Sequence, residues 1–278
     1  FCQATGDNAN LEPLVPNYHT FMGSIYQGRY ATGVAAGLKL KELIDKGALT
    51  PDKAVLGYVA AYPVPEVISG YTAFLLGARS IVPEAVMRVK YIRSWNNFVR
   101  EKEAAQMLFN GGAVVVGQHC DTIAAAIAAE EIATRQLAFH VGYNQSMVNV
   151  APTSSLVSTR NNWYPYLRGA VQAMLAGKRI EDVVPGRAAG NDMWSGFDND
   201  WVQLVEVNHA VAASETDAVL GKLVEDFRHG FSNIFRGDYE GVRLDGSPCS
   251  LRPGFHENAT RSAPAFDCVL NDVITIVP

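Results

Sequence analysis

Short runs of apolar, β-branched residues alternate with longer Ala-rich segments along the first two thirds of the chain. The short runs recur about every 20–30 residues, and each is followed by a turn of glycine, proline or polar residues. In the longer segments, apolar residues are spaced three or four apart, which is typical of one face of a helix. The pattern predicts strands at residues 55–59, 87–92, 113–117, 137–142 and 155–159, and helices at residues 23–46, 65–76, 99–109, 122–134 and 164–176.

Strands that alternate with helices in this way form βαβ units, which require a parallel sheet covered by helices on both faces. The remainder of the chain has fewer regular elements. We expect short strands at residues 193–195 and 201–207, a helix at residues 215–235 with Ser214 as its N-cap, and a strand-like end at residues 265–277. Residues 237–254 are rich in Gly, Asp and Pro, which predicts an irregular surface loop.

Composition narrows the class of protein. The chain has 278 residues, of which 48% are apolar and 18% charged, and its net charge is −5. So many apolar residues exclude intrinsic disorder, and no apolar run is long enough for a membrane span. A nucleic-acid partner is not expected, because such proteins present a basic surface.

Two features of the sequence concern its compartment. Cys249 and Cys268 could form a disulfide in an exported protein, but the scattered cysteines favour buried or free thiols. The chain opens on Phe1 without a basic segment followed by an apolar one, so we expect a processed start or a fragment.

Candidate ligand-binding residues follow the predicted strands. Ligands of open parallel sheets bind beyond the carboxyl ends of the strands, so residues at these five points are expected to converge. Three of the candidate residues also have a structural alternative: Trp95 as a core residue, Asp121 as a helix cap and Asn144 as a turn residue. The candidates are aromatic, amide, carboxylate and imidazole side chains: Tyr62, Trp95, His119, Asp121, Asn144, Asn161 and Trp163.

The same turns carry no recognised catalytic or cofactor motif. There is no dinucleotide or phosphate-binding glycine loop and no nucleophile elbow. His119 and Cys120 are adjacent, so their side chains tend to point apart and do not predict a nucleophilic pair. No second ligand cluster accompanies them, so no metal site is expected. His140, within an apolar run, is expected to be a core histidine.

Several segments together resemble the basic membrane protein family of ABC-transporter substrate-binding lipoproteins, which are similar to purine nucleoside receptors. The resemblance covers most of the chain. It is carried by residues 1–6, 17–18, 25–33 (IYQGRYATG), 57–68 (GYVAAYPVPEVI), 94–95, 101–105, 118–121 (QHCD), 142–144 and 263–275.

This resemblance implies a type I periplasmic-binding-protein fold: two doubly wound α/β lobes with parallel sheets, joined by hinge crossings. Residues 21–178 would form the second lobe, and residues 1–20 and 181–278 the hinge segments and part of an incomplete first lobe. Nucleoside-binding members carry Asp at the position of Asn144 and Lys near Asn161, and this sequence has neither.

The function that the resemblance implies is that of a non-enzymatic, extracytoplasmic receptor of an ABC importer, needing no cofactor. Its partners would be a purine base or nucleoside and an ABC permease, and it would be held at the membrane only by a lipid anchor absent from this sequence. The alternatives are a ligand-sensing regulatory domain of the same fold and a nucleoside-processing enzyme that uses His119, Cys120 or Asp121.

Overall fold

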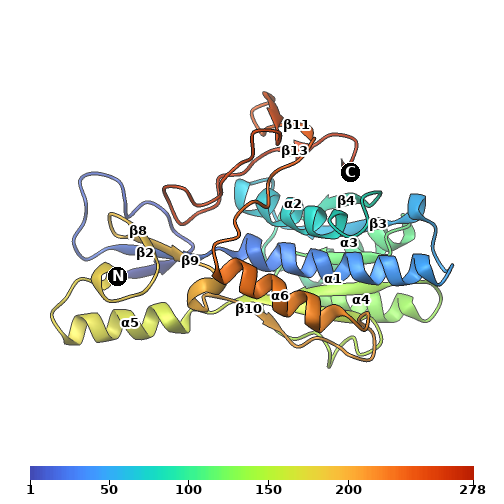
Figure 1. Cartoon of the computed structure of the whole chain (residues 1–278), viewed down its shortest axis with the longest axis horizontal. Helices are drawn as coiled ribbons and strands as arrows, with labels where there is room; N and C mark the ends of the chain where they lie inside the picture. Colours follow the sequence, from blue (N-terminus) through green and yellow to red (C-terminus); the bar gives the residue numbers. More distant parts are fainter.

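The computed structural model describes residues 1–278, which form a large α/β unit and a smaller sheet with one helix (Figure 1). The large sheet has seven strands in the order β10-β7-β6-β5-β3-β4-β14. Its five central strands are parallel: β3 (Val55–Ala60), β4 (Val86–Tyr91), β5 (Val115–Gln118), β6 (Phe139–Tyr143) and β7 (Ser155–Asn161). At its edges, β10 (Val202–Val205) is antiparallel to β7, and β14 (Ile274–Ile276) is parallel to β4.

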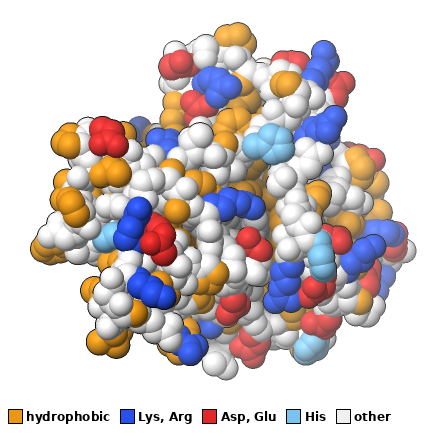
Figure 2. Space-filling model, turned by 60° about the vertical axis from the view of Figure 1, so that its left-hand side comes forward, with side chains coloured by type: hydrophobic (Ala, Val, Ile, Leu, Met, Phe, Trp, Pro, Cys, Tyr) orange, Lys and Arg blue, Asp and Glu red, His pale blue; other side chains and the backbone are white.

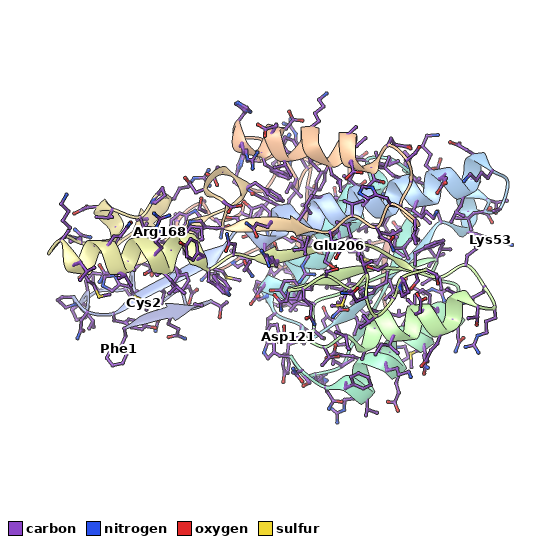
Figure 3. The ribbon with its side chains drawn as sticks, turned by 90° about the horizontal axis from the view of Figure 1, so that it is seen from below. Phe1, Cys2, Lys53, Asp121, Arg168 and Glu206 are labelled. Carbon is purple, nitrogen blue, oxygen red and sulfur yellow. A yellow bond between two sulfur atoms is a disulfide. The ribbon has the colours of Figure 1, made fainter.

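Helices cover both faces of this sheet, as the alternating pattern predicts (Figure 3). On one face lie α1 (Ile25–Asp45) and α2 (Pro65–Arg79), with α6 (Thr216–Arg228) outside α1. On the other lie α3 (Phe98–Asn110) and α4 (Ala124–Ala133).

Helices α1 and α2 meet at two glycines. A Cβ atom at Gly33 would lie 2.0 Å from the Phe74 carbonyl oxygen, and one at Gly77 would lie 2.1 Å from that of Tyr30. Two helix backbones can approach so closely only where side chains are missing.

The smaller sheet has four strands in the order β1-β2-β9-β8: β1 (Cys2–Ala4), β2 (His19–Gly23), β9 (Asp192–Ser195) and β8 (Arg187–Ala189). Helix α5 (Tyr164–Leu175) packs on it through an aromatic cluster separate from the main core. The Phe21 and Tyr166 rings stack with centroids 3.7 Å apart, and Trp201 meets Tyr166 edge-on.

Five of the outward-facing side chains of α5 are large and apolar, beside the exposed Arg168 and Gln172. Tyr164, Leu167, Val171, Met174 and Leu175 recur at helical spacing and are exposed. Figure 2, with this end of the molecule turned forward, shows hydrophobic side chains on that side.

The chain passes between the two sheets at three points: from β2 into α1, from β7 into α5, and from β9 into β10. A later segment, residues 257–262, also bridges them; we call it the strap. Glu257 accepts a hydrogen bond from Ser69 of α2 at 2.7 Å. At the other end, the Ser262 backbone N–H donates to Asp192 of β9, also at 2.7 Å, and Asp192 accepts a second bond from Thr20 of β2.

This packing places the lobe boundary differently from the division expected from the sequence. Helix α5 lies within residues 21–178 but belongs to the small sheet, because its apolar face packs on Phe21 and Trp201. Conversely, β10, α6 and β14 lie within residues 181–278 but join the large unit.

The predicted strands and helices of the first part are confirmed within a few residues at their ends. The second part needs corrections. Helix α6 ends at Arg228, before Gly230, and its N-cap is Glu215, whereas the Ser214 hydroxyl donates to the Glu215 side chain. In place of the single strand expected at residues 265–277, the structure has two short strands, β13 (Val269–Leu270) and β14.

Residues 237–254 are not wholly irregular. They contribute β11 (Glu240–Val242) and β12 (Pro248–Ser250) to a three-stranded sheet with β13. The preference for free thiols was wrong for one pair, because Cys249 and Cys268 form a disulfide that joins β12 to the segment before β13. Cys120 is buried and free, and Cys2 is exposed and free. None of the helices is long and apolar enough to cross a membrane.

Candidate functional site

A cavity of about 270 Å³ opens at the carboxyl ends of the central strands. The parallel pairing brings the ends of β3 to β7 to one edge of the sheet, as expected for an open α/β fold. In Figure 3 this edge, marked by Asp121, faces the small sheet, where Phe1 and Cys2 lie. The lining side chains come from both units: Thr5, Glu66, Trp95, His119, Asp121 and Tyr143.

One wall of the cavity is aromatic. Trp95, in the turn after β4, remains 40% exposed, so it is not the core residue that one alternative suggested. The Tyr62 ring, in the turn after β3, supports it at a centroid distance of 5.5 Å. Their exposed π-surface suits a planar or ring-shaped ligand.

His119 forms part of the interior of the site and is only 1% exposed. Its Nε2 lies 3.5 Å from Glu66 Oε1, and its Nδ1 is buried without a partner. Burial lowers the pKa of His119, and the nearby Arg29 charge lowers it further. The ring is therefore neutral at neutral pH, and Nε2 can donate or accept according to its tautomer.

The Asp121 carboxylate and the Asn144 amide form a hydrogen-bonded pair beside Trp95. Asn144 Nδ2 donates to Asp121 Oδ1 at 2.9 Å, and Asn144 has a left-handed backbone with φ 66°. Burial raises the pKa of Asp121, and Arg29 opposes this. The second carboxylate oxygen remains an acceptor for a ligand N–H or O–H group.

The alternative role of Asp121 as a helix cap is not observed. Thr122 Oγ1, rather than the Asp121 carboxylate, accepts from the Ala124 backbone N–H ahead of α4. The Asp121 backbone N–H donates instead to the Trp95 carbonyl at 2.9 Å, which ties the two turns together.

The fully buried side chain of Glu101, in α3, also holds these two turns together. Its carboxylate accepts from the Asn97 N–H at 3.0 Å and from the Thr122 hydroxyl at 2.7 Å. Burial raises the pKa of Glu101, and these hydrogen bonds oppose the shift. The turn that carries Trp95 and the turn that carries Asp121 are therefore held by one carboxylate.

The last two candidates lie toward the crossing between the units. Asn161 Nδ2 donates to the Tyr143 hydroxyl at 3.2 Å, while its Oδ1 is buried without a partner. Trp163 packs edge-on against Phe21, with ring centroids 5.5 Å apart. It does not line the cavity, because it belongs to the small-sheet cluster.

Sequence reasoning missed three lining residues: Thr5, Glu66 and Tyr143. Glu66 and Tyr143 lie in the segments already singled out, so counting every polar or aromatic side chain at these strand ends would have included them. Thr5 follows β1, and only the folded chain shows that it reaches the pocket from the small sheet.

Two further titratable side chains, Cys120 and His140, are buried. Cys120 is buried, and burial raises the pKa of its thiol, which opposes a nucleophilic thiolate. No group of three or more His, Cys, Asp or Glu side chains is placed to hold a metal ion. His140 lies in the core, where its Nε2 meets Gln118 Oε1 at 2.8 Å, and burial lowers its pKa to about 3.

The model of the Bmp family, described as ABC transporter substrate-binding protein PnrA-like, matches residues 2–227. This chain belongs to the Bmp family. The Bmp family is one of extracytoplasmic substrate-binding proteins.

Two curated relatives of this Bmp chain carry different ligands in their names. A purine-binding protein of Brucella abortus is 32% identical over 58% of this chain and 42% of its own length. A putative ABC transporter glucose-binding protein of Haloferax volcanii is 30% identical over 72% of this chain and 47% of its own. The Bmp chain thus matches less than half the length of each relative.

Solved structures confirm the fold expected for a Bmp protein. An ABC transporter solute-binding protein of Aeropyrum pernix has a TM-score of 0.64 at 12% identity, covering 87% of this chain and 70% of that one. One from Conexibacter woesei has a TM-score of 0.60 at 18% identity, covering 83% and 69%. The fold is the type I periplasmic-binding-protein fold.

Proposed function

We propose that this chain is the ligand-binding part of an extracytoplasmic receptor for an ABC importer, and that the ligand is a purine base or nucleoside. The observation that carries the proposal is the half-exposed face of Trp95 beside the acceptor oxygens of Asp121. A purine offers a flat π-face to the indole and N–H groups to the carboxylate at its edge.

The charges in the cavity support a neutral ligand. Glu66 and Asp121 both line it, and His119 is held neutral. A ligand that brings hydrogen-bond donors satisfies the carboxylates, whereas a phosphate would be repelled. This favours a base or nucleoside over a nucleotide.

A hexose is the competing ligand, because sugars also stack on tryptophan and donate hydroxyl groups to carboxylates. Two aromatic rings line the cavity, those of Trp95 and Tyr143, and Tyr62 packs against Trp95. A fully planar ligand uses more of this surface than a puckered sugar ring, which is why we favour a purine.

The location of the cavity supports transport by lobe closure. Thr5 reaches it from the small sheet, while the other lining groups come from the large unit. A ligand held by both sides would stabilise the closed arrangement through contacts absent from the open one. In the whole protein, we propose that the closed form delivers ligand to an ABC permease, with a lipid anchor retaining the receptor at the membrane.

The test is a thermal-shift screen followed by calorimetry with adenine, guanine, hypoxanthine, their nucleosides and glucose. A ligand that binds only the folded chain raises the melting temperature by mass action. A shift with purines and none with glucose supports the proposal. A shift with glucose alone would overturn the purine assignment and keep the receptor role.

A further inference from the structure

A buried arginine that forms no ion pair lies behind the groups that line the cavity. Arg29 of α1 is 2% exposed, and its Nη1 donates to the Gln118 carbonyl at the end of β5 at 2.5 Å. Its Nε and Nη2 are buried without partners. An unpaired buried charge is costly for folding, which makes Arg29 a candidate for a functional role.

Arg29 lies directly behind groups that line the cavity. Its guanidinium carbon is 3.8 Å from the centroid of the Tyr143 ring, a cation–π arrangement. The Gln118 carbonyl that it holds immediately precedes His119. One side chain therefore contacts both the Tyr143 wall and the turn that carries His119 and Asp121.

We propose that Arg29 is a positioning residue for the ligand site, fixing Tyr143 and the end of β5 and offsetting the Glu66 and Asp121 carboxylates from within the protein. This inference rests on the proposed function. The guanidinium does not line the cavity, so its effect reaches the ligand through the groups in front of it.

Electrostatic effects agree with this placement. The Arg29 charge opposes the rise that burial causes in the pKa of Asp121, and it adds to the fall in the pKa of His119. Arg29 thus favours an ionised carboxylate and a neutral imidazole. Against the effect of burial, Arg29 also lowers the pKa of Tyr58 of β3, Tyr143 of β6 and Cys120. Glu66 of α2 raises the pKa of the two tyrosines, and Glu101 of α3 raises that of Cys120.

The first test compares Arg29→Met with Arg29→Lys by calorimetry with the best purine ligand. Arg29→Met removes both the charge and the contact with Tyr143, so we expect affinity to fall about 2- to 30-fold near neutral pH. The ratio of its Kd to that of the wild type should grow from about pH 8 to about pH 5, because Asp121 then protonates more readily. Arg29→Lys keeps the charge and should show a smaller, pH-independent loss.

Arg79→Met is the matched control. Arg79 of α2 also lies over a tyrosine, at 5.4 Å from the Tyr239 ring centroid, and donates to a carbonyl, that of Ala85, but it is remote from the cavity. We expect its substitution to leave Kd unchanged at every pH. A constant Kd ratio for Arg29→Met across the pH range would overturn the electrostatic role.

The second test needs no ligand, so it separates this inference from the proposed function. If the wild type binds no purine, the proposed function fails, but the His119 ring can still be titrated by NMR. Its pKa should be higher in Arg29→Met than in the wild type, whereas an unchanged value overturns the inference. Removing an unpaired buried cation should also leave the melting temperature unchanged or raised, and a marked fall would indicate a purely structural role.

Discussion

At the scale of single residues, the site depends on a few side chains whose neighbours set their chemistry. Trp95 presents an open face because Tyr62 supports it from one side, and Asp121 keeps an unoccupied oxygen because Asn144 takes only one. The residue types could be read from the sequence. Their pairing could not, because Asp121 and Asn144 meet only when β5 and β6 lie side by side.

Substitution of Trp95 or Asp121 tests the ligand contacts. Trp95→Ala and Asp121→Ala should each weaken purine binding by about 1–3 kcal/mol, because a buried stacking or hydrogen-bonding partner is lost. Isothermal calorimetry measures the change. Tyr164→Ala on the exposed face of α5 is the aromatic control, and loss of binding in this variant as well would point to general damage.

The pH dependence of binding follows from Asp121. Burial raises its pKa, and a ligand that donates to the carboxylate favours the ionised form. Affinity should therefore fall as the pH drops through this pKa, and binding there should release a proton. Calorimetry in buffers of different ionisation enthalpy measures that proton, and in Asp121→Asn it should disappear.

At the scale of elements, the sequence predicts the central βαβ part well, because each strand and helix carries its own apolar periodicity. Helix α1 is found within two residues of the expected range, ending before Gly47, which has φ +70°. The later elements are set by tertiary contacts instead. The β11–β13 sheet forms where the Cys249–Cys268 disulfide brings distant segments together, which no local pattern encodes.

The close approach of α1 and α2 gives a prediction at this scale. Gly33→Ala should lower the free energy of unfolding by roughly 1–3 kcal/mol, because the added methyl group meets the Phe74 carbonyl. Gly221→Ala in α6 is the control, since nothing lies within 4 Å of its Cβ position. It should stabilise the protein by about 0.5–1 kcal/mol through helix propensity, and urea denaturation measures both. Equal effects would show that the helix contact tolerates a methyl group.

At the scale of the whole molecule, the two units are joined by the crossings and by the strap. The sequence does not reveal this division, because α5 directly follows β7 of the large unit along the chain but packs with the small sheet. Helix α6 comes late in the chain and packs on α1, more than 150 residues earlier. Burial raises the pKa of Asp192, which receives bonds from β2 and from the strap. This carboxylate links the small sheet to a segment anchored on α2.

Asp192→Ala should uncouple the two units during unfolding. Trp194 lies in β9, and Trp163 and Trp201 belong to the aromatic cluster of the small sheet, so fluorescence reports mainly on that unit. Circular dichroism reports mainly on the helices of the large unit. In urea the two signals should coincide for the wild type and separate for the variant, with fluorescence changing first. Coincident curves in the variant would show that the strap does not couple the units.

The hydrogen bond between Asn144 and Asp121 has a consequence for selectivity. The Trp95 and Asp121 turns are locked together by Glu101, but Asn144 joins them through its side-chain amide. A ligand donor can bind the other Asp121 oxygen without breaking this bond, whereas a donor that takes the place of the amide only exchanges one hydrogen bond for another. Selectivity between ligands of similar polarity then depends on the shape of the surface that they bury. In a series of purines with the same hydrogen-bonding edge but different substituents, the order of affinity should therefore follow the size of the substituent.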